Sequence, residues 1–367
     1  MKAATIRRYG GPEVVRIEEL PLPVAGPHEV RVRVTAAGVT TADARLRAND
    51  APRGFGFLMR CLTGLIRPRH PVFGMEFAGV VESLGAGAAG FSLGQRVFGI
   101  TGIKGGAHAE YLTIRADARL FALPEALSDV QGAAFFFGGL TAADFLMDKA
   151  DIRQGDRLLI NGATGSVGSA AIQIGHHLGA KVTAVARAEN HAFARELGAG
   201  DTIDYRAGPI SGQWDVILDV VGSLPYPKAA ALLTCGGRLL PVTATLAQQM
   251  SYGLRPKRGL HCITGGVIGD GKAAMERLIR LYSAGVYCPT VGDVLPFAEI
   301  ATAHACASSR HKRGNTVVLI TLAAQHRVAG IGSTGPKPWR QAPPDPVLIQ
   351  GISASCLSVR TMRRAAI

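Results

Sequence analysis

The chain has 367 residues, of which 47% are hydrophobic and 18% charged, a composition typical of a globular protein large enough for two domains. No apolar run approaches the roughly 20 residues of a membrane span, and the first residues turn polar too soon for a secretory leader, so we expect a cytoplasmic protein with no membrane partner. The net charge of +13 is dispersed and not interleaved with aromatic residues, which argues against nucleic acid, and the six scattered cysteines argue for a reduced protein without structural zinc.

The first third of the chain is predicted to be rich in β-strands. Residues 29–34 alternate polar and apolar side chains with a period of two, and residues 77–84 form another strand that ends at a glycine pair. Leu123-Pro124 marks a boundary. From Ser128 onward, helices lead into the alternation of strands and helices that is typical of a parallel sheet, which runs to about residue 259.

The most informative segment lies inside that alternation. A strand at residues 158–160 leads into a glycine-containing loop, a helix follows, and further strands are predicted at residues 182–186 and 214–219. Gly165 would let the backbone approach a pyrophosphate and Gly168 would let the helix pack closely, whereas Ala163 replaces the usual first glycine. We therefore predict a dinucleotide site formed by Ala163, Thr164, Gly165, Ser166, Val167 and Gly168.

The last part of the chain divides into an ordered segment and a tail. We expect a helix at residues 273–283 and a final strand at residues 315–321. From about residue 323 the chain has five prolines within eleven residues, few acids and no amphipathic period until its last dozen residues. This composition predicts a disordered extension, with a basic docking arm as the alternative.

Several segments, in order along the chain, resemble one protein family. These segments are Ala36-Ala37-Gly38-Val39, His70-Pro71-Val72-Phe73-Gly74-Met75-Glu76-Phe77-Ala78-Gly79, Phe91-Ser92-Leu93-Gly94, Gly138-Gly139-Leu140-Thr141, the glycine loop, Ile203-Asp204-Tyr205 and His311-Lys312-Arg313-Gly314-Asn315. The chain resembles the zinc-independent, quinone-oxidoreductase-like branch of the medium-chain dehydrogenase/reductases, which includes zeta-crystallin.

The resemblance implies an α/β fold with two domains and an active site between them. A GroES-like β-barrel catalytic domain would span residues 1–124 and 261–322. A Rossmann domain with a doubly wound parallel sheet would span residues 125–260, and residues 323–367 would be a non-homologous tail. It also implies a possible homodimer that continues the Rossmann sheets edge to edge.

The resemblance also decides what to expect of a metal. Zinc-dependent relatives place a cysteine and a histidine where this chain has Thr40 and Met75. A hydroxyl and a thioether are poor zinc ligands compared with a thiolate and an imidazole. We therefore expect no metal site and no metal-dependent alcohol oxidation.

The expected cofactor is NADPH, with NADH less favoured. NAD-selective folds usually place an acid at the end of the second strand of the nucleotide domain, whereas this chain has Arg187, whose guanidinium suits a 2′-phosphate. Glu189 is a complication, because its carboxylate could accept from the ribose hydroxyl of NAD. The resemblance adds Asn190, Tyr205 and Asn315 as cofactor contacts.

The implied reaction is hydride transfer from nicotinamide to a quinone or to an α,β-unsaturated carbonyl. The resemblance places Thr40, Thr41 and Thr141 near the nicotinamide, although each threonine could equally be an ordinary strand or capping residue. Relatives often carry a tyrosine after the Asp43 motif, and this chain has none there. The proton donor is thus open between solvent, the cofactor ribose and Asp43, and we expect a structural hydrogen bond or ion pair from Glu76.

Three apolar or paired motifs have two interpretations each. Residues 53–66 could line an apolar substrate pocket or form a short amphipathic helix. Phe135-Phe136-Phe137 favours core packing, and His176-His177 favours a helix surface over a metal site. Two other functions stay open as alternatives: an enoyl-thioester reductase, and a non-catalytic NADPH-binding protein.

Overall fold

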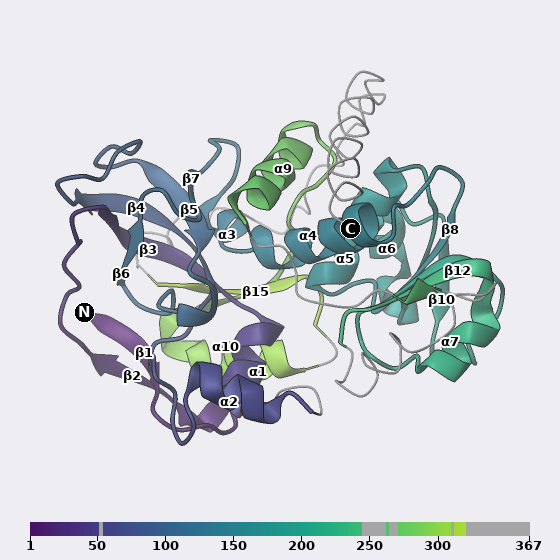
Figure 1. The fold of residues 1–367 in the computed structure, drawn as a ribbon, viewed down its shortest axis with the longest axis horizontal. Helices are drawn as coiled ribbons and strands as arrows, with labels where there is room; N and C mark the ends of the chain where they lie inside the picture. The colour runs from purple at the N-terminus through teal and green to yellow at the C-terminus, as the bar shows by residue number, and fades with distance from the viewer. Residues whose placement is uncertain (51–53, 244–261, 264–270, 310–311, 321–367) are drawn as a thin grey trace, which may run out of the picture. The chain divides into compact units, whose positions relative to one another are not determined.

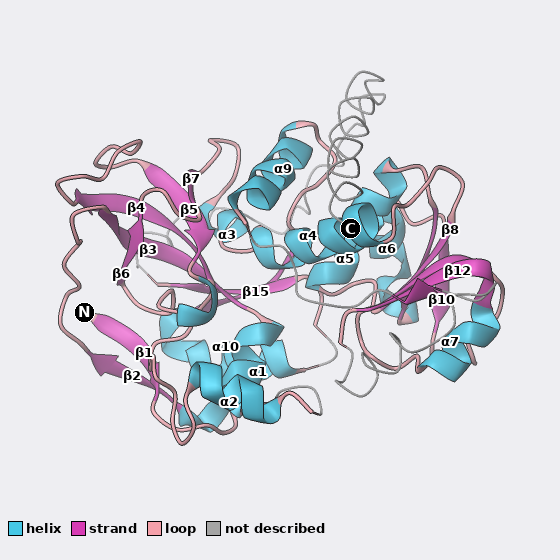
Figure 2. Cartoon of the chain, viewed as in Figure 1, coloured by secondary structure: helices cyan, strands magenta, loops and turns pink. Residues whose placement is uncertain are grey.

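Two large β-sheets organise the part of the chain that the computed structural model describes, namely residues 1–50, 54–243, 262–263, 271–309 and 312–320. One sheet is wholly parallel and the other largely antiparallel (Figures 1 and 2). All described residues belong to one unit, Met1–Thr334. None of the helices described there is both long and apolar enough to cross a bilayer.

The parallel sheet has the strand order of a dinucleotide-binding fold. The first three strands of this sheet lie side by side in the reverse of their chain order. The next three strands lie on the other side of the first strand and follow chain order. In spatial order the strands are β10 (Asp201–Asp204), β9 (Lys181–Ala186), β8 (Arg157–Asn161), β11 (Trp214–Asp219), β12 (Leu233–Pro241) and β13 (Cys262–Ile263). The order reverses between β8 and β11, which is where such sheets bind ligands.

Helices complete the nucleotide-binding part. They are α3 (Asp129–Gly132), α4 (Phe136–Ala143), the π-helical η3 (Asp144–Lys149), α5 (Ser166–His177), η4 (Ala188–Asn190), α6 (His191–Glu196), α7 (Tyr226–Leu232) and α9 (Lys272–Ser283). Small residues let α5 approach the sheet, because a Cβ at Gly175 would lie only 2.7 Å from a Leu158 methyl carbon. The apolar residues predicted for this helix, such as Ile172 and Ile174, are fully buried.

The second sheet is built around one long strand. It contains β14 (Val291–Pro296), β15 (Asn315–Leu319), β3 (Glu29–Val39), β4 (Glu76–Leu84), β5 (Arg96–Ile100) and β7 (Leu120–Ala122), with β6 (Tyr111–Arg115) also paired to β3. The strand β3 continues to Val39, past the predicted end at residue 34, because its second half pairs with β15 and β4. A separate two-stranded sheet joins β1 (Lys2–Ile6) to β2 (Val15–Glu19).

Short helices flank this second sheet. They are η1 (Pro12–Val14), α1 (Thr41–Ala48), α2 (Gly56–Thr63), η2 (Gly102–Lys104), η5 (Phe297–Glu299) and α10 (Ile300–Ser308). Helix α2 falls in the segment with two interpretations. The segment forms a short helix, and its residues Leu62 and Thr63 line a pocket, whose use by a substrate stays a prediction.

The two sheets share a buried core. One hydrophobic cluster contains Ala78 and Phe98 from the antiparallel sheet together with Leu158 and Ile160 from the parallel sheet. Phe98 stacks on Phe136, with ring centroids 4.8 Å apart. Phe135 and Phe136 are fully buried, which confirms the core interpretation of this aromatic motif.

The predicted helix at 273–283 and strand at 315–321 correspond to α9 and β15, with bounds that differ by one or two residues. His176 is exposed at the end of α5. The domain division at residues 124, 260 and 322 stays a prediction, and the tail from residue 323 lies outside the described residues.

Candidate functional site

The loop between β8 and α5 provides open space in front of a helix N-terminus. Gly165 is the N-cap residue of α5, and a Cβ there would have one heavy atom within 4 Å, the Gly162 oxygen at 3.9 Å. A Cβ at Gly168 would instead lie 2.2 Å from that same oxygen. Gly168 therefore permits close packing of helix and loop, whereas Gly165 leaves room for a ligand.

This loop fits the pyrophosphate of a nicotinamide dinucleotide. The first N–H groups of α5 have no intrahelical acceptor and carry the positive end of the helix dipole. Ser166 is buried, and its Oγ has no hydrogen-bond partner within the described part of the chain. Ala163 and Val167 are buried beneath the loop, and the Ala163 amide donates to the Val185 carbonyl at 3.2 Å.

A buried polar pair that sequence reasoning missed fixes the loop. The Asn161 amide, at the end of β8, donates to Asp219 Oδ1 at 2.8 Å, at the end of β11. The Asp219 carboxylate also accepts from the backbone N–H groups of Gly222 and Leu224, each at 2.9 Å. The sequence signal was a polar residue at the end of each of two apolar strands. This network ties together the two loops at the switch point.

The residues predicted to recognise the adenosine end lie close together. Arg187 follows β9 directly, and its Nε donates to the Tyr205 hydroxyl at 3.0 Å. Its Nη1 lies 3.4 Å from Glu189 Oε1, and the Asn190 amide donates to the Arg187 carbonyl at 2.9 Å. Hydrogen bonding to Tyr205 raises the pKa of Arg187 further, so the guanidinium stays charged.

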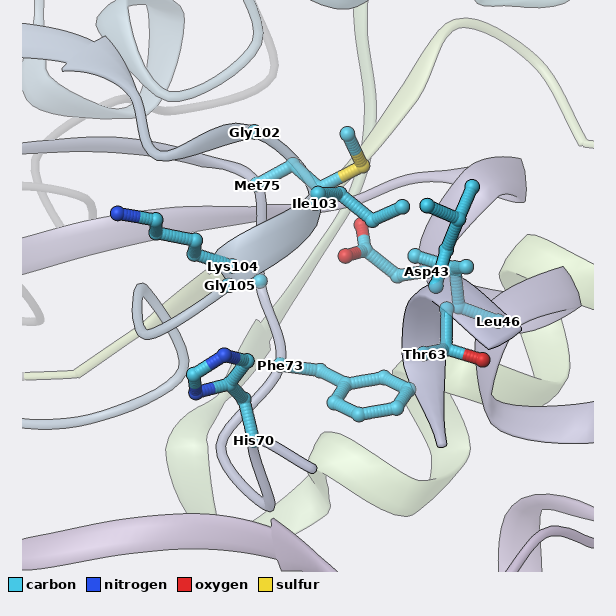
Figure 3. Close-up of a pocket in the computed structure, with 12 residues that line it drawn as sticks. Asp43, Leu46, Thr63, His70, Phe73, Met75, Gly102, Ile103, Lys104 and Gly105 are labelled. Carbon is cyan, nitrogen blue, oxygen red and sulfur yellow. The ribbon is translucent and has the colours of Figure 1, made fainter. Parts of the chain in front are cut away.

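A pocket lies on the antiparallel sheet's side of the molecule (Figure 3). Its walls are mostly apolar, with one carboxylate and two basic side chains. The lining residues are Asp43, Leu46, Leu62, Thr63, His70, Phe73, Gly74, Met75, Gly102, Ile103, Lys104 and Gly105. Such a lining suits an apolar or aromatic ligand with few polar groups.

Thr40 and Asp43 form a capping box at the start of α1. The Thr40 hydroxyl and amide donate to Asp43 Oδ2 at 2.6 and 2.8 Å, and the Asp43 amide donates back to Thr40 Oγ1 at 3.2 Å. Both side chains are buried, and Asp43 Oδ1 has no hydrogen-bond partner in the described structure. Thr41 is the first residue of α1. The box holds the Asp43 carboxylate at the pocket wall.

Glu76 connects the antiparallel sheet to α4. Its Oε1 accepts a hydrogen bond from the Phe137 backbone amide, and the Phe137 carbonyl accepts from Thr141 Oγ1 at 2.7 Å. This is the structural hydrogen bond that the sequence led us to expect for Glu76. Burial raises the pKa of Glu76 from 4.5 to about 8. Thr141 is thus bonded within its own helix, one turn from the Glu76 contact.

Lys312 is a residue that sequence reasoning left without a role. Its neighbour Gly314 donates its amide to the Thr164 carbonyl at 2.8 Å, and Arg313 stacks on the Phe193 ring at 3.8 Å. These contacts anchor the segment beside the glycine loop. Burial lowers the pKa of Lys312. The electrostatic interaction with Asp43, and a weaker one with Glu76, act in the opposite direction.

The Asn315 side chain makes a structural contact at the start of β15. Its side-chain amide donates to the Thr290 carbonyl at 2.9 Å, so it fixes the start of β15. The contact between this segment and the glycine loop is made by the Gly314 backbone instead. A cofactor contact by Asn315 stays a prediction.

The donor set near the pocket does not fit zinc. The Thr40 hydroxyl is engaged with Asp43, and Met75 offers only a thioether. His108 Nε2 bonds the Gly38 carbonyl at 3.0 Å. Across the described ranges, no three His, Cys, Asp or Glu side chains are grouped so that they could hold a metal ion.

A parallel nucleotide-binding sheet joined to a pocket-bearing antiparallel sheet defines a medium-chain dehydrogenase/reductase. Residues 26–125 match the family model of the alcohol dehydrogenase GroES-like domain, and residues 197–318 match that of the zinc-binding dehydrogenases. The chain belongs to the quinone oxidoreductase branch of this superfamily, and it is an NAD(P)H-dependent oxidoreductase.

Individual relatives cover nearly the whole described body. A quinone oxidoreductase of Pseudomonas aeruginosa is 30% identical over 334 residues, 85% of this chain and 97% of the relative. A quinone oxidoreductase of Sus scrofa is 29% identical over 338 residues, 88% of this chain and 98% of the relative. The solved quinone oxidoreductase of Coxiella burnetii superposes with a TM-score of 0.76 at 27% identity and covers 88% of this chain and 99% of that one.

Proposed function

We propose that this protein is a zinc-independent, NADPH-dependent reductase of quinones or α,β-unsaturated carbonyls. The observation that carries the proposal is the donor set at the pocket: Thr40 is bonded to Asp43 and Met75 stands beside them, where metal-dependent relatives need a thiolate and an imidazole. Reduction of an electron-poor double bond needs no metal-bound alkoxide, so this pocket suits that reaction class.

The preference for NADPH is supported by the end of β9. Arg187 and Tyr205 present a guanidinium and a hydroxyl from neighbouring strand ends. The contact between Arg187 and Glu189 is long and exposed, and such pairs contribute little, so a 2′-phosphate would compete successfully for the guanidinium. The α5 N-terminus and the Ser166 hydroxyl would hold the pyrophosphate.

When bound, the nicotinamide would supply a hydride to the electron-poor carbon of the acceptor. The protein has to position the acceptor and stabilise the negative charge that develops on its oxygen. We assign that role, and the donation of the proton, to Lys312, because its ammonium interacts electrostatically with Asp43, a wall residue of the pocket. Asp43 favours the charged ammonium against the effect of burial.

An acceptor panel tests this proposal. Purified protein with NADPH and a chelator is offered phenanthrenequinone, benzoquinone, short enals and a crotonyl thioester, and the loss of reduced nicotinamide is followed. Turnover of quinones or enals supports the proposal. Turnover of the thioester alone would favour the enoyl-thioester reductase, and tight NADPH binding without any turnover would favour a binding protein.

A further inference from the structure

Exposed apolar side chains that the proposed reaction does not use occur on α2, on the turn that follows it and on η2, and two of them line the pocket. Leu62 and Ile103 line the pocket and are 57% and 51% exposed, so they lie where it meets solvent. Phe57, Leu65 and Ile66, on the same helix and the turn after it, are 78%, 58% and 91% exposed. We call these five residues the apolar rim. Single exposed apolar residues are common, whereas several on one short segment that also lines a pocket mark an interaction surface.

The rim is held in place by specific contacts. The Tyr9 hydroxyl donates to the Gly64 carbonyl at 2.7 Å and lies 3.0 Å from the Thr63 hydroxyl, which fixes the end of α2. The Arg69 amide donates to the Thr63 carbonyl at 2.8 Å, which closes the following turn. A Cβ at Gly64 would lie 2.0 Å from the Arg67 carbonyl oxygen, so the tight turn requires glycine. These contacts of the turn therefore keep Leu65 and Ile66 in exposed positions.

The segment that carries four of the five rim residues is basic. Residues 51–75 contain four arginines and no acidic residue. Arg67 and Arg69 are exposed, next to the apolar side chains, and Lys104 lies on the other side of the pocket. Apolar side chains interleaved with basic ones are the pattern of segments that bind the interface of an anionic bilayer. A second copy of this chain, which also carries arginines here, would not complement this charge.

We propose that the apolar rim and its arginines dock the protein on an anionic phospholipid surface, with the mouth of the pocket facing the lipid. The apolar side chains enter the interface, and Arg67 and Arg69 contact lipid phosphates. The sequence led us to expect no membrane partner because it holds no spanning segment. A surface that binds a membrane peripherally needs no membrane-spanning segment. Here it is assembled from a short helix, the turn after it and the Gly102–Lys104 segment. An acceptor dissolved in the bilayer would then have direct access to the pocket.

Vesicle co-sedimentation tests the proposal without using turnover, so its failure is distinct from failure of the reductase assignment. The full chain is mixed with vesicles of phosphatidylcholine alone and of phosphatidylcholine with phosphatidylglycerol, at low and high salt. We expect binding to the anionic vesicles that weakens with salt. F57S with I66S is expected to lower partitioning by about tenfold or more. R67E with R69E should lower it by about fivefold or more for each arginine.

Matched controls carry the same changes elsewhere. Val24 and Leu93 are 84% and 67% exposed, so V24S with L93S removes equally exposed apolar groups, and R153E reverses an exposed arginine. These controls should bind like the unaltered protein, and thermal unfolding checks that all variants fold. No binding to anionic vesicles, equal loss in the controls, or rim variants that change only the oligomeric state in gel filtration would overturn the proposal.

Discussion

Arg187 donates from Nε to the hydroxyl of Tyr205 across 3.0 Å, and this bond links the end of β9 to the residue that follows β10. Both side chains lie at the edge of the parallel sheet where the adenosine half of a dinucleotide binds in this fold. The bond holds the guanidinium in position, so the side chain loses less conformational entropy when it binds a phosphate. The cofactor preference of the enzyme should therefore depend on this pair.

Removal of Arg187 should convert the cofactor preference. Because a hydrogen bond to a charged group contributes about 1.5–3 kcal/mol, R187A should raise the KM for NADPH about 10- to 100-fold and leave that for NADH nearly unchanged. Arg195 offers a control, since its guanidinium also donates to a hydroxyl, that of Thr202, at 2.8 Å. Steady-state kinetics with both cofactors distinguishes the two, and an equal effect of R187A on NADH would contradict the assignment.

The two glycines of the loop should separate binding from folding. G165V places its side chain in open space, so the melting temperature should hardly change. The same side chain would block the hydrogen bonds between the loop and the charged pyrophosphate, so the affinity for NADPH should fall by about a hundredfold or more. G168V forces a Cβ within 2.2 Å of the Gly162 oxygen and should cost about 1–3 kcal/mol of stability or more. Calorimetry of unfolding and of binding checks both, and a destabilised G165V would refute the idea of an open cradle.

The extent to which the sequence predicted this fold follows from how local each signal is. The strand, loop and helix at residues 157–177 were predictable because apolar period, glycines and chain order all lie within one short segment. The extension of β3 to Val39 was not, because the partner that pairs with it, β15, lies far along the chain. Burial and pairing of this kind leave no local pattern.

The site was predictable to a similar degree. Ala163 to Gly168 and Arg187 were predicted from the motif and its strand context, and Tyr205 from the resemblance. Lys312 had no assigned role because its environment is built by Asp43 and Glu76, which are distant in sequence. The rim of α2 likewise became visible only once the exposure of its side chains was known.

Neutralising Lys312 should slow the chemical step. Loss of one charged donor to a developing oxyanion typically costs about 10²- to 10³-fold in kcat, so we expect K312M to fall in this range with the KM for NADPH unchanged. K312R should recover part of the rate, and the alkaline fall in kcat of the unaltered enzyme should move to higher pH in this variant. K228M, at an exposed lysine, is the control. A K312M enzyme that only loses stability would show a structural role instead.

Glu76 should make the protein less stable as the pH rises. Its pKa is raised from 4.5 to about 8 by burial, so between these values the folded state keeps a proton that the unfolded state has released. The free energy of unfolding then falls with increasing pH, by up to about 1.4 kcal/mol per unit. E76Q should lack this slope. Denaturant unfolding at a series of pH values measures it, and an equal slope in both proteins would contradict the assigned pKa.

The most direct test of a zinc-independent, NADPH-dependent reductase is the rate at which the metal-stripped enzyme oxidises NADPH with a quinone. This rate is compared with the rate of NADH oxidation under the same conditions. The enzyme is dialysed against a chelator, and its metal content is measured before the assay. We expect full activity without zinc and a clear preference for NADPH. Activity that disappears with the metal and returns when zinc is added, or an equal or greater rate with NADH, would contradict this expectation.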